Sequence, residues 1–186
     1  MKSLVANFKQ EYGKTPKAVR RFIKSALLLF IAWQLLYHFL LEPYRIPDAW
    51  LTGVTARATA WVWSFFEPGM WVLAGNPMDY VVMQNTRIVG IADGCNALEV
   101  YVLYIAFLIC YPVTSWKKVM LIGLGGIVGI AVLNVARCSA IGWLGLHHPQ
   151  WVDFAHHYAF TLIVYAFVFL LWRIYVRTED KKTATG

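Results

Sequence analysis

A cysteine, an arginine and a pair of adjacent histidines carry the most reactive chemistry in this sequence. Cys95 stands in Asp-Gly-Cys-Asn, Arg137 ends Asn-Val-Ala-Arg, and the histidines are His156 and His157. A cysteine thiolate is a nucleophile, an imidazole can take and return its proton, and a guanidinium can hold an oxyanion. Singly, each residue is best explained by packing, anchoring or polarity, so the inference of acyl transfer depends on their lying together.

The elements that must position these residues are hydrophobic runs. Of the 186 residues, 59% are hydrophobic and 16% aromatic, which exceeds the usual share in soluble domains. We expect four membrane-spanning helices at residues 22–41, 95–114, 119–138 and 156–174, since each run approaches the length that crosses a bilayer. The predicted fold class is therefore all-α, a polytopic bundle of membrane helices.

The basic residues predict how the bundle is oriented. All lysines fall at residues 2–24, 117–118 and 181–182, a distribution that indicates cytoplasmic ends and loops rather than nucleic-acid binding. We expect residues 1–21 to form a basic cytoplasmic segment, residues 22–176 a membrane-embedded domain, and residues 177–186 a cytoplasmic tail. With both termini cytoplasmic, the protein would lie in the cytoplasmic membrane with an even number of spans.

Two further elements are predicted on the outer side. Residues 50–66 place apolar side chains on one helical face, but Arg57 would lie mid-membrane if they crossed it, so we expect an interfacial or re-entrant helix. The apolar face consists of Leu51, Val54, Ala58, Trp61, Val62 and Phe65. Residues 80–92 alternate weakly around a polar Gln-Asn-Thr and predict a short β-hairpin that leads into Asp93.

Counting along the predicted helices brings the reactive residues to one level. About 20 residues at ~1.5 Å each cross a ~30 Å hydrocarbon core, so counting from residues 117, 118 and 173 places Cys95, Arg137 and His156 near the outer boundary. Cys95 would begin its helix, where free backbone N–H groups favour a thiolate. The choice between His156 and His157 stays open, because adjacent helical residues point about 100° apart.

Polar neighbours could support such a site. Asn134 lies one turn from Arg137, Glu99 one turn from Cys95, and Asp153 could cap the last helix or orient an imidazole. We expect no metal or cofactor, because the three cysteines form no ligand pattern. Cys110 is interpreted as a packing residue, and a disulfide between Cys95 and Cys138 is the minor alternative to free thiols.

The three motifs together resemble the exosortase/archaeosortase family. In that family a cysteine begins one span at the outer side, an arginine ends the next, and a histidine begins the one after. The matching residues are Cys95, Arg137 and His156, and the similarity covers roughly residues 80–175. The chain departs from the family by having Asn96-Ala97 where many members have Ser-Gly, and by its second histidine, His157.

The resemblance implies a membrane cysteine transpeptidase that acts on the outer face. Cys95 would attack a peptide carbonyl in the C-terminal sorting signal of a secreted, membrane-tethered protein, with His156 as base and acid and Arg137 on the oxyanion. An acceptor, such as a glycolipid or polysaccharide, would then release the thioester. The alternative is a non-catalytic accessory protein of polysaccharide export or surface-protein assembly. A lipid phosphatase is disfavoured because its Ser-Gly-His motif is missing, and a transporter because the spans carry no polar track beyond Glu99.

Overall fold

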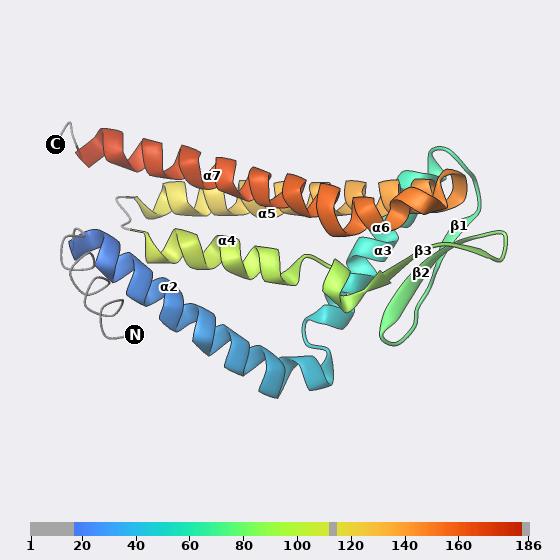
Figure 1. Ribbon diagram of the computed structural model, residues 1–186, viewed down its shortest axis with the longest axis horizontal. Coiled ribbons are helices and arrows are strands. Elements are labelled where there is room, and N and C mark those ends of the chain that lie inside the picture. The colour runs from blue at the N-terminus through green and yellow to red at the C-terminus, as the bar shows by residue number, and fades with distance from the viewer. Residues whose placement is uncertain (1–16, 112–114, 184–186) are drawn as a thin grey trace, which may run out of the picture.

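Four helices lie along the long axis of the molecule in a computed structural model that describes residues 17–111 and 115–183. They are α2 (Lys17–Leu36), α4 (Leu98–Cys110), α5 (Trp116–His147) and α7 (Phe160–Thr183). The start of α2, the end of α4, the start of α5 and the end of α7 meet at one end, and α3 (Asp48–Ser64) and a small sheet occupy the other (Figure 1). We call that second end the head.

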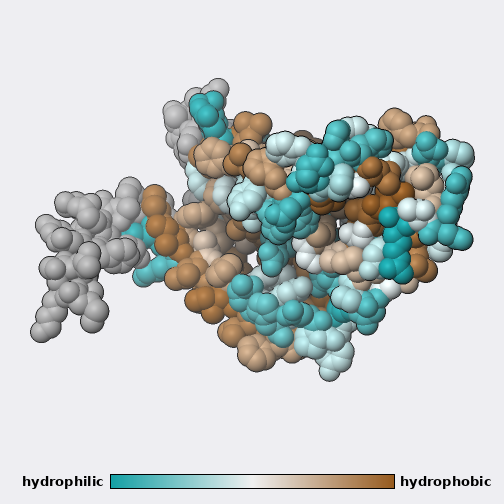
Figure 2. Space-filling view, turned by 45° about the vertical axis from the view of Figure 1, so that its right-hand side comes forward, coloured by the Kyte–Doolittle hydropathy of each residue, from teal (hydrophilic) through white to brown (hydrophobic). Residues whose placement is uncertain are grey.

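The helices have the length and composition of a membrane protein. The helical stretches Val19–Tyr44, Trp116–His147 and Pro149–Arg177 are long and apolar enough to cross a bilayer, whereas α4 is a shorter apolar helix of 13 residues. Hydrophobic side chains cover the surface of α2, and hydrophilic ones gather on the head (Figure 2). The predicted membrane bundle of helices with a small β element is therefore confirmed.

The helix that follows Cys95 begins later than predicted. Asp93–Cys95 form a 3-10 turn, and α4 starts only at Leu98. Between them Ala97 has φ +64°, in the left-handed region that cannot continue a right-handed helix. Cys95 therefore lies on a turn before the helix and not in its first turn; residues 112–114 of the predicted span lie outside the described part of the chain.

Helix α5 is much longer than the predicted span of residues 119–138. Its 32 residues extend about 48 Å at ~1.5 Å each, and it ends at His147, well beyond the predicted end at residue 138. The half that contains Val119 and Ile130 packs against α4 and α7, and the half that contains Cys138 packs against α3 and the sheet. Arg137 lies within the length of α5 and not at its end, between the half that packs against α4 and α7 and the half that packs against α3 and the sheet.

Glycines allow the close helix contacts in both cores. At Gly126 an added Cβ would overlap the ring of Tyr104, whose hydroxyl donates to the Ile122 carbonyl at 2.8 Å. Gly142 similarly lies against Ile88 and Trp63 in the head. Close packing of this kind depends on small residues in membrane helices.

Helix α3 buries the side opposite its apolar face. Its buried side is small and hydroxylated, and the predicted apolar face includes Trp61 and Phe65, which are 64% and 68% exposed. The buried residues include Thr52, Thr55, Ala56, Thr59 and Ala60. They pack against the sheet and α5. The bulky aromatic side chains face away from the protein, as tryptophan often does at a membrane interface.

The sheet has three antiparallel strands, β1 (Met70–Leu73), β2 (Met78–Met83) and β3 (Thr86–Ala92), in the order β1-β2-β3. The predicted hairpin corresponds to β2 and β3, and β1 was not predicted because Met-Trp-Val-Leu is too short to alternate clearly. β3 ends at Ala92, directly before the turn that carries Cys95. The sheet thus positions this turn at the end of the helices that faces the head.

The chain reaches α7 through the 3-10 turn Pro149–Trp151, the single turn α6 (Val152–Phe154) and a π-helical turn, Ala155–Ala159. A second π-helical turn, Tyr37–Leu41, follows α2 and leads to the 3-10 turn Glu42–Tyr44. Such turns are rare and often occur at functional sites. Both lie near the head, and one of them contains His156 and His157.

Candidate active site

Cys95, Arg137 and His156 meet at the junction between the membrane bundle and the head. The Cys95 Sγ lies 3.4 Å from the His156 Nε2, and the Arg137 Nη2 lies 3.1 Å from that same nitrogen and 4.0 Å from Sγ. A guanidinium can only donate, so Nε2 accepts from it and the neutral ring carries its proton on Nδ1. The three residues come from a turn, from the middle of α5 and from the π-helical turn before α7.

An arginine fixes the turn that carries Cys95. The Arg45 Nε and Nη2 donate to the two oxygens of Asp93 at 2.7 and 2.8 Å, and the Thr52 hydroxyl donates to Oδ1 at 2.8 Å. Hydrogen bonds from Arg45 hold the pKa of the Asp93 carboxyl below its usual range, against the opposing effect of burial. Bidentate pairing of this type sets orientation as well as energy.

Buried hydrogen bonds hold the other side of the turn. The Asn96 amide donates to the Asp48 Oδ1 at 2.8 Å, and its Oδ1 accepts the Leu98 backbone N–H at 2.9 Å. The Tyr37 hydroxyl donates to the second Asp48 oxygen at 3.1 Å. Asn96 and Asp48 are each 1% exposed, so these bonds tie the start of α4 to the start of α3 in an environment where a lost partner is costly.

Asn134 connects the turn to α5. Its amide donates to the Cys95 backbone carbonyl at 2.9 Å, and the side chain is buried. Since Asn134 and Arg137 are one helical turn apart, α5 contacts both the backbone and the sulfur of Cys95. The structure therefore places Asn134 next to the site, as a supporting residue would be.

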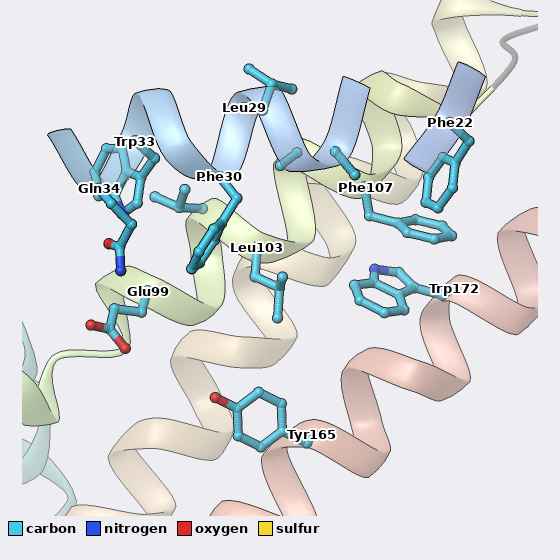
Figure 3. A pocket seen from close by; sticks show the side chains of 13 residues that line it. Phe22, Leu29, Phe30, Trp33, Gln34, Glu99, Leu103, Phe107, Tyr165 and Trp172 are labelled. Atoms are coloured by element: carbon cyan, nitrogen blue, oxygen red, sulfur yellow. The ribbon is translucent and has the colours of Figure 1, made fainter. Parts of the chain in front are cut away.

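The other three proposed supporting residues do not contact Cys95, Arg137 or His156 through any described hydrogen bond. The His157 Nδ1 lies 3.0 Å from the Asp153 Oδ1, and both side chains are exposed. Asp153 thus pairs with His157 and not with His156. Glu99 lines an apolar groove between α2, α4 and α7 (Figure 3).

All three cysteines are free thiols. The alternative of a Cys95–Cys138 disulfide is therefore wrong for this structure, although Cys95 packs against the cluster that contains the buried Cys138. Cys110 is half-buried on α4.

Arg45, Asp48, Thr52 and Asn96 are the site residues that sequence reasoning did not assign. One signal was present for Arg45: it is one of few basic residues on the predicted outer side, and each such arginine requires a local partner. The remaining three residues resemble ordinary polar residues at helix ends, because their partners are distant in sequence.

The comparisons with known proteins identify the family. The family described as transmembrane exosortase matches residues 13–174. The chain belongs to the transmembrane exosortase family. No curated protein and no solved structure gives a match. Membership indicates a transmembrane protein related to protein sorting, and the matched range includes Cys95, Arg137 and His156.

Proposed function

We propose that this exosortase is a cysteine transpeptidase that cleaves the C-terminal sorting signal of secreted, membrane-tethered proteins and transfers them to an acceptor. The observation that carries the proposal is the 3.4 Å approach of the Cys95 Sγ to the His156 Nε2, with Arg137 in contact with both. A thiol, a base and a fixed positive charge at these distances satisfy the geometric requirements of nucleophilic acyl transfer.

Each residue has a role in that reaction. The His156 Nε2 takes the thiol proton in place of its hydrogen bond from Arg137. The released Arg137 guanidinium is near enough to stabilise charge on sulfur and then on the oxyanion of the tetrahedral intermediate. His156 returns the proton to the departing amine, which leaves a thioester on Cys95. Asn134, Asn96 and the Arg45–Asp93 pair keep the turn in place.

The arrangement of the helices supports activity on the outer face of the cytoplasmic membrane. Lys17, Lys24, Lys117 and Lys118 lie on the ends of α2 and α5 away from the head (Figure 1), and lysine-rich ends stay in the cytoplasm. We therefore propose that the head and the site face outward, with both chain ends in the cytoplasm.

Trapping a substrate on Cys95 tests the function. In wild-type protein quenched with acid during turnover, we expect mass spectrometry to find an envelope protein joined to Cys95 as a thioester, and His156→Ala, which lacks the base for both steps, should give far less of it. Cys95→Ala should give no adduct and no processing, and Cys95→Ser should retain little activity because a hydroxyl is a much weaker nucleophile at neutral pH. Full processing by Cys95→Ala would refute the proposal in favour of a non-catalytic accessory role.

A further inference from the structure

The outward face of α3 carries a stripe of residues that the described part of the chain leaves exposed. It consists of Trp50, Val54, Arg57, Trp61 and Phe65. At about 100° per residue these positions fall within roughly 80° of the helix circumference, so they form one surface, which we call the α3 stripe. Contiguous exposed apolar surface marks a site of interaction with a protein or a membrane.

The depth of α3 matches the headgroup layer of a bilayer. Its first residue, Asp48, accepts from Asn96, and near its end Trp63 lies against Gly142. Gly142 is only five residues beyond Arg137 on α5, or about 8 Å at ~1.5 Å per residue, whereas the 17 residues of α3 extend about 25 Å. The helix thus runs obliquely across the end of the bundle (Figure 1). A rise of about 8 Å fits the roughly 5–8 Å of headgroups on each side of a ~30 Å hydrocarbon core.

The lipid-facing surface of the first span leads to this stripe. The stretch Val19–Tyr44 is long and apolar enough to cross a bilayer. Phe39, Tyr44 and Ile46 are exposed along the connection from α2 to α3, and Trp50 follows them as the first residue of the stripe. Exposed apolar side chains therefore continue from a membrane span to α3, which places the α3 stripe beside the same bilayer.

Arg57 supplies a positive charge in the middle of the stripe. Its guanidinium makes no hydrogen bond or ion pair with another described residue. It lies 3.3 Å from where a Cβ of Gly53 would stand, one turn nearer to the start of α3, and so reaches back toward the bundle. The Asp79 carboxylate also lies beside this glycine, but it is buried and accepts the Gly75 N–H instead.

We propose that the α3 stripe binds the lipid headgroup layer on the side of the head, and that Arg57 binds the phosphate of an anionic phospholipid there. A guanidinium matches phosphate oxygens with two parallel N–H donors, and the stripe contains no acidic residue that would repel them. Tryptophan rings favour this level of a membrane. The inference does not depend on the proposed transpeptidase function.

Binding of the stripe to the headgroups also sets the depth of the nucleophile. Asp48, at the start of α3, accepts from Asn96 at 2.8 Å. Thr52, on the buried side of the same helix, donates to Asp93 at 2.8 Å. One face of α3 thus contacts the membrane surface while the other holds the residues on both sides of Cys95.

Photo-crosslinking identifies what covers the α3 stripe. The full-length protein with p-benzoylphenylalanine in place of Trp61 or Val54 is irradiated in vesicles of equal parts phosphatidylcholine and phosphatidylglycerol, and mass spectrometry identifies the adducts. We expect phospholipid adducts at both positions. Leu28, which is exposed on α2 within the span, is the positive control. Asn85, in the exposed turn between β2 and β3, should give no lipid adduct.

The identity of the adduct decides between occupants, and thermal unfolding checks that each variant is folded. An adduct of the Trp61 variant with another protein, or with a second copy of this chain, would overturn the lipid assignment. The assignment would also fail if the Trp61 and Val54 variants gave no adduct under conditions in which the Leu28 variant reacts with lipid.

The role of the charge is tested by which lipid reacts. With the crosslinker at Trp61, Arg57→Gln should lower the ratio of phosphatidylglycerol to phosphatidylcholine adducts about five-fold, the effect of one arginine at an anionic membrane surface. Arg87→Gln is the matched control and should leave the ratio unchanged, because Arg87 is exposed on β3 and lies over the ring of Tyr80, 4.4 Å from its centre. The same ratio in Arg57→Gln as in wild type would refute the phosphate contact.

Discussion

The adjacent histidines give the sharpest test of the site, because each serves as the control for the other. The His156 imidazole contacts both Sγ and the guanidinium, whereas His157 is 61% exposed and pairs with Asp153, which is 86% exposed. Loss of a general base costs about 10²–10⁴-fold in rate, and an exposed ion pair contributes only about 0–1 kcal/mol to stability. We therefore expect His156→Ala to slow acylation of Cys95 by about two to four orders of magnitude and His157→Ala by less than about three-fold.

The assay treats each purified variant in phosphatidylcholine vesicles with p-nitrophenyl acetate, so that nitrophenol release counts acylated Cys95, with Cys95→Ala as the background. Thermal unfolding establishes that both variants fold. Processing of envelope proteins in cells, at matched expression, gives a second measure. Equal losses in the two variants would mean that the 3.4 Å contact has no catalytic role. A loss confined to His157→Ala would preserve the cysteine mechanism and assign the base to the other histidine.

The remaining predictions concern the turn that carries Cys95. Asn96→Ala should lower the free energy of unfolding by about 3 kcal/mol, because a buried charge-assisted hydrogen bond and a bond to the start of α4 are both lost; a melting temperature within about 2 °C of wild type would contradict this. Ala97→Gly should raise stability by up to about 1 kcal/mol, measured by chemical unfolding in detergent, since φ is +64° there; a destabilised variant would show that the buried methyl group outweighs the strain. Arg45→Gln should destabilise the protein near neutral pH. The difference from wild type should begin to shrink as the pH falls through about 4, the pKa of an unfolded aspartate, and should vanish only below the lowered pKa of Asp93 in the folded state. Melting curves between pH 7 and pH 3 measure the difference, and a gap that does not change with pH would contradict the ion pair's role.

The long-range features of this fold follow from patterns that a sequence displays directly. Apolar runs and clustered lysines predicted the membrane bundle, and the level of Arg137 could be counted from Lys118 because one unbroken helix joins them. In α3 the apolar stripe faces outward, since such a stripe indicates the core only when water is the alternative. In a membrane protein Trp61 can face outward while Thr52 packs inside.

The exact surroundings of the nucleophile could not be predicted. Asn96 and Asp48 are 48 positions apart, as are Arg45 and Asp93, and no local rule connects residues at that separation. The start of α4 was misplaced because Ala97 adopts a conformation that its residue type disfavours. Tertiary hydrogen bonds determine the backbone there.

The π-helical turn Ala155–Ala159 has a consequence for chain length. Such a turn contains about one residue more than the α-helical turn it replaces, so the extra residue can be absorbed locally while the helix on either side keeps its direction. The two adjacent histidines lie inside this turn. We infer that the second histidine is the extra residue that the π-helical turn accommodates. Removal of His157 should restore a regular turn and leave His156 facing Cys95, and homologues shorter by one residue at this point should retain one histidine and an unbroken α-helix.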